Sequence, residues 1–370
     1  MRSLVRSLVP ALVPALVRAP AMTPVMALAL ALTPTGPAAA QPAPPALAWV
    51  TNQGSDDVSV LALTPGEPVR EIARVPACRA PAGVVAVAAR ERVWVSCPDD
   101  GRLAEIDMRS RQRLALWPGG QGPLGLDASA DGRWLHVVDW YGRQLRSHDL
   151  DRPAEPPRLT PLGRAPAGVA ADAGATAWVS ERDDDRVALI DAAQGRVLAR
   201  VAVGRHPFAL LRDPQRPRLY VLNVESDDLS VIDTTRREVI ATLPTGRAPY
   251  GAALADDGRL LYVTNQHDDS VSVFDAQRLQ PLRRLDGFGY PEGIAAWGDA
   301  VHVVEWMDER VSVLDARSGA PRQRVATGRN SRGFGAFIAA RPDAPLVPEA
   351  RPPRADPPTA AACPAAAATC

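Results

Sequence analysis

The sequence has no lysine: its 42 basic residues are all arginine, and 42 acidic residues balance them. The missing amine excludes Schiff-base lysines, a P-loop lysine and serine–lysine nucleophile pairs. A formal net charge of zero disfavours chain-wide attraction to nucleic acid or to an anionic membrane. Any partner must therefore be recognised through local groups of residues.

Several catalytic and cofactor motifs are also missing. None of the four cysteines lies in the Cys-x-x-Cys or Cys-x-x-Cys-His spacing of a redox dithiol or a covalently attached haem. Gly-x-Ser-x-Gly and His-Glu-x-x-His do not occur, so a serine esterase elbow and a zincin helix are unsupported. Gly120–Gly125 matches Gly-x-Gly-x-x-Gly, but it contains a proline and leads into a predicted strand. We predict no cofactor and no metal site.

The N-terminal apolar run, 21–32, is too short and too interrupted by proline to span a bilayer. It follows Arg2, Arg6 and Arg18 and precedes the small residues 38–40, a combination that is typical of a secretory signal peptide. We predict cleavage after Ala40, with 1–40 as the signal peptide, 41–47 as a short linker and no transmembrane segment. The mature protein is then periplasmic or secreted.

The last residues, 341–370, are rich in proline and alanine and cannot build a core, so we expect a disordered tail. Export permits disulfides. Cys78 and Cys97 are predicted to lie on the same face of one repeat, where a bridge between them fits. Cys363 and Cys370 lie in the tail, where they could close a small loop, pair between chains or stay free; four cysteines allow three complete pairings.

A short phrase returns seven times along the chain: an aromatic residue or histidine, then valine, one further residue and a polar residue. Its valines are spaced by 45, 42, 42, 42, 42 and 40 residues: Val50, Val95, Val137, Val179, Val221, Val263 and Val303. This period is the length of a four-stranded propeller blade. The sequence therefore predicts an all-β fold over 48–340, a seven-bladed β-propeller with four antiparallel strands per blade.

The repeat 204–243 shows the strands most clearly. A turn at Gly204–Pro207 precedes predicted strands 208–212, 218–222, 229–233 and 238–243. The first repeat begins directly with its second strand at Ala48, whereas 333–339 looks like a first strand with no blade after it. We expect this C-terminal strand to complete the first blade, which removes the open edges of the ring.

Two recurring positions have structural explanations. The aromatic position of the second strand includes His136 and His302, and His148 occupies a position that is apolar in other repeats; we expect all three to be core residues. An aspartate ends the third strand of six repeats, where it should bond the backbone of the following turn: Asp107, Asp149, Asp191, Asp233, Asp275 and Asp315.

The repeats resemble the YVTN family of propeller repeats. Residues 262–265 read Tyr-Val-Thr-Asn, and 49–52 and 220–223 are close variants. A Gly-x-x-Pro-x-Gly turn at 246–251 and a Val-Ser-Val-x-Asp strand at 271–275 complete the pattern. The resemblance covers 49–339 and implies an exported seven-bladed propeller; the family includes a periplasmic type that binds single-stranded DNA. No catalytic motif carries over.

The loops that end the second strands and the Gly-x-x-Pro turns should converge on one face of the ring, which we call the loop face. We expect arginines of the turns and acidic clusters of the loops to pair there between blades. The position after the turn proline varies most and should line the mouth of the central channel: Ala82, Leu124, Ala167, Phe208, Tyr250, Glu292 and Arg332.

The candidate ligand-binding residues follow from these departures from the repeat. They are His206, Phe208, Arg247, Tyr250, Tyr290, Glu292, Trp306, Arg329 and Arg332, with His267 and Asn330 nearby and Trp140 and Tyr141 as a separate aromatic pair. An arginine, a carboxylate and aromatic rings can hold a polar small molecule or a peptide carboxylate.

The leading functional hypothesis is a non-enzymatic exported scaffold, expected to be a monomer, that binds an unknown protein or small polar ligand on its loop face. The first alternative is a lactonase-like hydrolase or an accessory subunit of a periplasmic dehydrogenase, with Glu292 as base and Arg247 or Arg332 holding an oxyanion. The second alternative is single-stranded nucleic-acid binding, which the balanced charge disfavours.

Overall fold

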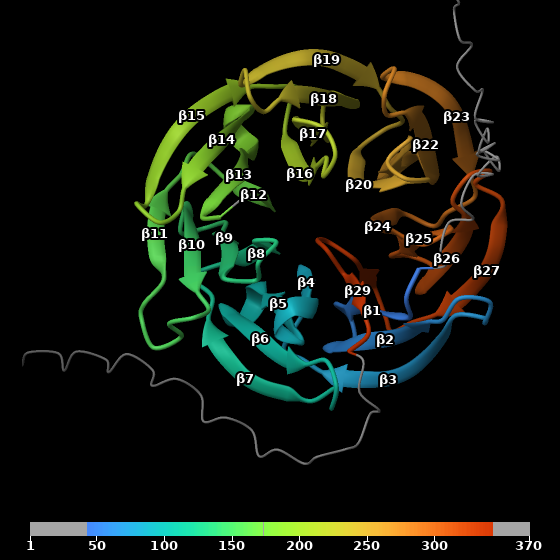
Figure 1. Cartoon of the computed structure of the whole chain (residues 1–370), viewed down its shortest axis with the longest axis horizontal. Coiled ribbons are helices and arrows are strands. Elements are labelled where there is room, and N and C mark those ends of the chain that lie inside the picture. The colour runs from blue at the N-terminus through green and yellow to red at the C-terminus, as the bar shows by residue number, and fades with distance from the viewer. Residues whose placement is uncertain (1–42, 173, 343–370) are drawn as a thin grey trace, which may run out of the picture. The chain divides into compact units, whose positions relative to one another are not determined.

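The computed structural model describes residues 43–172 and 174–342, and it confirms the seven-bladed β-propeller. Figure 1 shows the sheets of this part of the chain radiating around a common axis, with almost no helix. None of its helices is long and apolar enough to cross a bilayer. The predicted signal peptide, nearly all of the predicted tail, and Cys363 and Cys370 lie outside the described residues.

Each blade is an antiparallel sheet whose strands are stacked from the axis outwards (Figure 1). The innermost strands of six blades are β4 (Val84–Val87), β8 (Pro123–Ala128), β12 (Pro166–Ala171), β16 (Pro207–Arg212), β20 (Pro249–Ala255) and β24 (Pro291–Trp297). The second strands are β1 (Ala46–Asn52), β5 (Arg92–Cys97), β9 (Trp134–Asp139), β13 (Thr176–Glu181), β17 (Arg218–Asn223), β21 (Leu260–Asn265) and β25 (Ala300–Glu305).

The third strands are β2 (Asp57–Leu63), β6 (Arg102–Asp107), β10 (Gln144–Asp149), β14 (Arg186–Asp191), β18 (Asp228–Asp233), β22 (Ser270–Asp275) and β26 (Arg310–Asp315). The outermost strands are β3 (Arg70–Pro76), β7 (Arg113–Pro118), β11 (Arg158–Pro161), β15 (Arg196–Ala202), β19 (Glu238–Pro244), β23 (Gln280–Asp286) and β27 (Pro321–Ala326). The connections include the 3-10 helices η1 (Ala88–Arg90), η2 (Pro98–Asp100), η3 (Arg182–Asp184) and η4 (Gln266–Asp268).

The second strands form the centre of the core, because both faces of each sheet pack against neighbouring blades. All residues of β9 and β21 are buried. The aromatic position packs against the next blade: Trp178 of β13 shares a hydrophobic cluster with Val221 of β17. His136, His148 and His302 are buried, as predicted.

The aspartates that end the third strands close their turns, as predicted. Asp233 Oδ1 accepts hydrogen bonds from the amides of Thr235 and Arg236, both at 2.9 Å. Asp315 Oδ1 accepts from the amides of Arg317 and Ser318 at 3.1 and 2.7 Å. These carboxylates are held by local backbone and are not free for chemistry.

In five places neighbouring blades approach each other closely at a glycine near the start of the innermost strand. A Cβ atom placed on any of these glycines would lie 2.3 to 2.4 Å from a carbonyl oxygen of the next blade or of the closing segment: Gly83, Gly125, Gly168, Gly251 and Gly293. No side chain tolerates that separation, so only glycine permits the approach.

Where the blades approach each other, a side-chain hydroxyl of the second strand forms hydrogen bonds to the backbone of both blades. Thr264 Oγ1 accepts a hydrogen bond from the Gly251 amide at 2.8 Å and donates to the Glu292 carbonyl of the next blade at 2.8 Å. Ser96 and Ser180 repeat the arrangement. The threonine of the Tyr-Val-Thr-Asn phrase is thus an inter-blade tie, which alternates with apolar residues at Val138, Leu222 and Val304.

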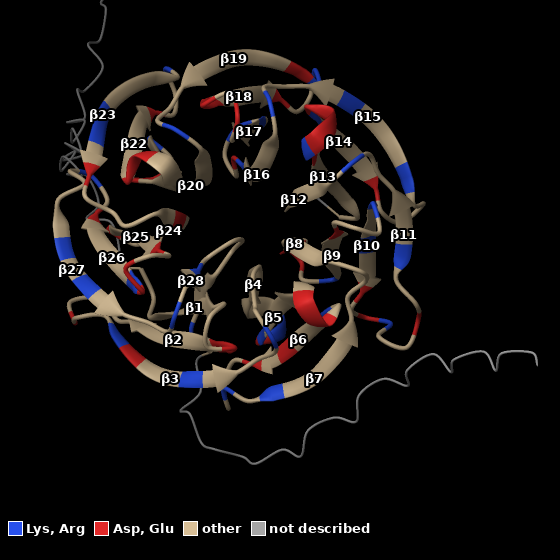
Figure 2. Ribbon diagram, turned by 180° about the vertical axis from the view of Figure 1, so that it is seen from behind, with Lys and Arg blue, Asp and Glu red and all other residues tan. Residues whose placement is uncertain are grey.

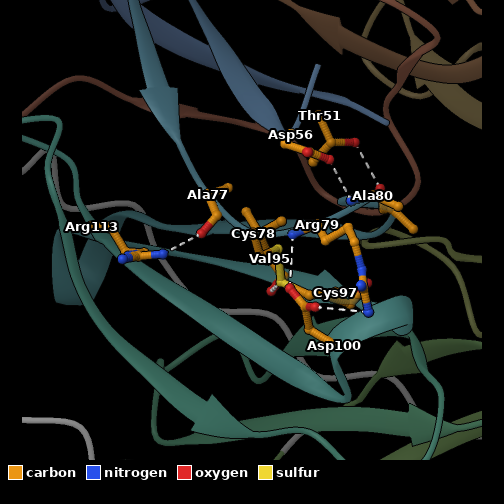
Figure 3. Close-up of a disulfide and its surroundings, with 12 residues drawn as sticks. Thr51, Asp56, Ala77, Cys78, Arg79, Ala80, Val95, Cys97, Asp100 and Arg113 are labelled. Atoms are coloured by element: carbon orange, nitrogen blue, oxygen red, sulfur yellow. Dashed lines mark hydrogen bonds and ion pairs between the residues drawn. A yellow bond between two sulfur atoms is a disulfide. The ribbon is translucent and has the colours of Figure 1, made fainter. Parts of the chain in front are cut away.

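The polar residue that follows the hydroxyl position holds the turn that enters its own blade. Asn265 Oδ1 accepts from the Gly246 amide at 3.0 Å, and Glu181 Oε1 accepts from the Gly163 amide at 2.7 Å. In the second blade these two positions are Cys97 and Cys78. A disulfide with Cα atoms 6.0 Å apart replaces the hydrogen bond there (Figure 3).

The C-terminal segment closes the ring, as predicted, but it is not one continuous strand. β28 (Ser331–Arg332) and β29 (Ile338–Ala340) both pair with β1, and between them five residues, 333–337, face only Trp49 and Val50. The excess bulges away from β1 onto β4, whose Val84 amide donates to the Phe334 carbonyl at 2.9 Å. The predicted single strand 333–339 is therefore interrupted, and β1 begins two residues earlier than predicted.

Replacing Thr264 by valine should lower the free energy of unfolding by about 1–3 kcal/mol, because the isosteric change leaves the Gly251 amide and the Glu292 carbonyl unpaired. Urea unfolding followed by circular dichroism measures this loss. Thr235→Val, in an exposed turn, is the matched control and should change little. Equal unfolding midpoints for the two variants would contradict the hydroxyl tie.

Candidate ligand site at the channel mouth

The rim of the loop face is built from ion pairs that stay within one blade. Arginines of the turns bind aspartates of the loop that follows: Arg79 with Asp100, Arg164 with Asp184, and Arg247 with Asp268. The expected pairing of these arginines between blades is therefore wrong. Blades are joined instead by a carboxylate and a backbone amide, as where Asp227 Oδ1 accepts from the Ala248 amide at 2.8 Å.

Charge is accordingly balanced around the ring. Figure 2 shows both signs of charge around the whole ring, with arginines on outer strands such as β15 and β27 and acidic residues mainly in the loops and turns. Arginines that are already paired with carboxylates offer little free positive charge to a phosphate backbone.

Three of the predicted site residues lie on the rim and not at the channel mouth. Arg247 Nε lies 2.6 Å from Asp268 Oδ1. His206 Nδ1 lies 3.3 Å from Glu225 Oε2, and Arg329 is exposed. These side chains are engaged locally or point to solvent.

The variable position after the turn proline does bring four predicted residues together: Phe208, Tyr250, Glu292 and Arg332. The ring centroids of Phe208 and Tyr250 are 4.7 Å apart. Phe334 of the closing segment lies 5.1 Å from Phe208, and Trp140 lies 6.4 Å from it. Trp140, Phe208, Tyr250 and Phe334 form what we call the aromatic layer, so Trp140 is not a separate feature.

A buried ion pair lies beside the aromatic layer. Glu292 is 2% exposed, and its Oε2 lies 3.6 Å from Arg332 Nε. Gln266 Nε2 donates to Glu292 Oε1 at 3.1 Å, and Arg332 Nε donates to Gln53 Oε1 at 3.0 Å. Arg332 Nη1 lies 3.5 Å from the Tyr250 hydroxyl. Glu292 Oε2 has no hydrogen-bond partner among the described residues.

Burial and neighbouring charges together set the pKa values of Glu292, Tyr250 and Arg332. Burial raises the pKa of Glu292 to about 7, although Arg332 and Gln266 both favour the charged form. Burial and the charge of Glu292 raise the pKa of Tyr250, so the phenol stays protonated. Burial alone would lower the pKa of Arg332, but Glu292 and Tyr250 together raise it. Near neutral pH the ion pair therefore carries a partial excess of positive charge.

A second aromatic group adjoins the ion pair. The Tyr290 ring lies 5.6 Å from Trp306 and 5.8 Å from His267. Burial and then the charge of Glu292 raise the pKa of the Tyr290 hydroxyl. Tyr290 and Trp306 are partly exposed, while Trp306 Nε1 is buried with no hydrogen-bond partner in the described part of the chain. These rings offer a surface for a ligand next to the charged pair.

Sequence reasoning missed Phe334, Gln53 and Gln266. Phe334 stands between two glycines in the segment that was expected to be a regular strand, and this Gly-Phe-Gly run was the available signal. Gln53 and Gln266 immediately follow an asparagine that ends a second strand. Neither glutamine departs visibly from a loop consensus, so only the structure reveals their contacts.

No family model and no curated protein matches this chain. Among solved structures, the fold is similar to a functionally unknown protein from Desulfotomaculum acetoxidans DSM 771, with a TM-score of 0.67, 15% identity, and coverage of 80% of this chain and 99% of that chain. It is also similar to Kuenenia stuttgartiensis hydrazine synthase, with a TM-score of 0.61, 16% identity, and coverage of 72% and 91%. At these identities the likeness shows the fold alone, and membership of the YVTN family stays a prediction.

The raised pKa of Glu292 predicts a measurable pH dependence. Between the ordinary carboxyl pKa of 4.5 and about 7, the folded protein holds a proton that the unfolded chain has released, so this residue's contribution to stability falls as pH rises through that window. Above pH 7 the decrease in the free energy of unfolding caused by Glu292 should approach about 3 kcal/mol. We therefore expect the free energy of unfolding of Glu292→Gln, relative to that of the wild type, to be higher at pH 8 than at pH 5. Urea unfolding at the two pH values measures this difference.

The matched control for this measurement is Glu238→Gln, whose carboxylate is on an exposed outer strand. Its stability should follow the wild type at both pH values. Parallel pH curves for Glu292→Gln and the wild type would show that Glu292 titrates normally.

Proposed function

We propose that this protein is an exported propeller of the YVTN type that binds a small carboxylate-bearing ligand at the mouth of its central channel. One observation carries the proposal: the buried Glu292 carboxyl group faces the partly exposed Arg332 beside aromatic rings, and Glu292 Oε2 lacks a hydrogen bond within the described residues. Buried polar atoms are usually paired in folded proteins, so an unpaired carboxyl oxygen beside a partly exposed arginine and aromatic rings supports a ligand site. When protonated, this carboxyl group can donate a hydrogen bond to a ligand oxygen.

The charge of the cluster supports an anionic ligand. Arg332 is partly exposed, and its Nη2 atom makes no hydrogen bond within the described residues. A guanidinium with a free edge binds a carboxylate through charge-assisted hydrogen bonds. With the pKa of Glu292 raised to about 7, protonation of this neighbour removes its repulsion of an incoming anion. Tyr290 and Trp306 would flank the apolar part of the ligand.

A second candidate function is hydrolysis, favoured by the same carboxyl group. A general base or acid works best when its pKa is near the working pH, and the pKa of Glu292 is raised to about 7 by burial. Arg247 cannot share this role from its contact with Asp268 on the rim, which leaves Arg332 as the cation for an oxyanion. Lactones therefore belong in the ligand panel.

Calorimetric titration of the full chain with free dicarboxylates, amino acids and short peptides with free or amidated C-termini tests the binding role. We expect a subset of the carboxylates to bind, and Arg332→Gln to weaken that binding at least about tenfold, because a charge-assisted hydrogen bond contributes about 1.5–3 kcal/mol. Loss upon C-terminal amidation would indicate a peptide or protein partner.

Arg247→Gln is the matched control, since Arg247 is also a loop-face arginine but is bound to Asp268. Its affinity should remain within about twofold of the wild type, a difference well below 1 kcal/mol. No binding across the panel, or equal losses in the two variants, would overturn the proposal. Lactone turnover that disappears in Glu292→Gln would replace it with the hydrolase.

Export is the second part of the proposal, and the Cys78–Cys97 disulfide supports it. Disulfides persist in oxidising compartments and are rare in the cytosol. After cell fractionation with thiol alkylation, we expect the protein in the periplasmic or secreted fraction, with both cysteines protected until a reductant is added. Recovery from the cytoplasm with reactive Cys78 and Cys97 would contradict export.

A further inference from the structure

A chamber of about 440 Å³ lies on the other side of the aromatic layer. Tyr250, Glu292 and Phe334 form its inner end. Arg212, Pro214 and Trp297 also line it; they stand at or just beyond the ends of their innermost strands, on the face opposite the Gly-x-x-Pro turns. The channel therefore has two compartments with different chemistry, and the ligand site proposed above uses only the loop-face one.

Small residues on the innermost strands create the chamber. Its walls include Ala170, Ala252 and Ala296 together with the glycines of the inter-blade approach, and larger apolar contacts come from Ile294 and Ile338. A protein interior normally fills such space with side chains. The volume and the mostly apolar lining are those of a small-ligand pocket.

Asp127 differs from the other charged residues that line the chamber because no cationic side chain among the described residues compensates its charge. Among its charged lining residues, Arg212 Nε binds Asp172 Oδ1 at 2.7 Å and Glu292 faces Arg332. Asp127 has only backbone donors: the Ala128 amide bonds Oδ1 at 2.8 Å and the Ala171 amide bonds Oδ2 at 2.9 Å. No cationic side chain in the described part of the chain pairs with Asp127.

A carboxylate can accept about four hydrogen bonds, and the two backbone amides supply only two of them. A carboxylate without a counter-charge is costly in an apolar environment, and the burial of Asp127 raises its pKa to about 6, although both amides favour the charged form. At neutral pH the chamber still holds one uncompensated negative charge. A bound cation would supply the missing partner.

We propose that this chamber binds a small organic cation, a protonated amine whose ammonium group pairs with Asp127 and whose apolar body packs against Ile294, Trp297 and Ile338. The carboxylate supplies the charge selectivity, and the alanine and glycine walls supply the space. This site adjoins the carboxylate site at Tyr250 and Glu292 and selects ligands of the opposite charge.

Calorimetry with three compounds of similar shape tests the proposal on the full chain at pH 7.5: 2-phenylethylamine, 2-phenylethanol and 3-phenylpropanoate. The amine should bind at least about tenfold more tightly than the alcohol, as expected for a desolvated ion pair, and the carboxylate should not bind in the chamber. In Asp127→Asn the affinity for the amine should fall to the affinity for the alcohol.

Two further variants guard against a folding defect in Asp127→Asn. Ala296→Leu, at a half-buried lining residue, should fill the chamber and weaken the binding of both amine and alcohol while leaving Asp127 in place. Asp131→Asn changes an exposed carboxylate in a turn of the same blade and should bind like the wild type. Equal affinity for amine and alcohol, or no binding of either, would overturn the proposal.

The two ligand sites can fail independently. Arg332→Gln reports on carboxylates at the mouth and should not weaken amine binding, because it leaves Glu292 at the chamber's inner end without its counter-ion. Asp127→Asn reports on amines in the chamber and should leave carboxylate binding unchanged. Amine binding that Arg332→Gln abolishes and Asp127→Asn does not would place the cation at the mouth and overturn the chamber assignment.

Discussion

The close approach of neighbouring innermost strands is the constraint on which the rest of this structure depends. Glycines bring the backbone of one blade to within van der Waals distance of the next, and in several blades a serine or threonine hydroxyl bridges the two. Thr264, for example, bonds both the Gly251 amide and the Glu292 carbonyl. A buried amide and a buried carbonyl are thereby satisfied by one side chain, which holds adjacent blades in register.

This approach also sets the chemistry of the channel. Five of the residues that cross between blades are glycines, which leave the space along the axis unfilled, and the residue before each crossing position varies in size and chemistry. Four of these preceding residues, Phe208, Tyr250, Glu292 and Arg332, come from consecutive blades around the ring. Their convergence produces an aromatic layer and an ion pair at the mouth, with an unfilled chamber beyond them.

Ring closure links the C-terminal end of the propeller to this channel. The closing segment has more residues than β1 can pair, and the excess inserts Phe334 among the aromatic rings of distant blades. Arg332 belongs to the same segment, at its pairing with Thr51. Two residues of the candidate site, Arg332 and Phe334, therefore belong to the segment that completes the fold. A change that loosens closure should disturb the mouth as well.

The chain by itself determined the number of blades, the strands of the repeat, the buried histidines and the aspartate turns, because each follows from a short pattern that recurs every 40 to 45 residues. It also identified the variable position that opens the innermost strand, since a repeat makes departures from its own consensus visible. Tertiary structure alone decided which candidates meet. Arg247 pairs with Asp268 on the rim, whereas Phe334 and Asp127 line the chamber. Gln53 and Gln266 bond Arg332 and Glu292, and these contacts join segments far apart in sequence. The curvature of the closed ring sets those pairings, and no local pattern encodes that curvature.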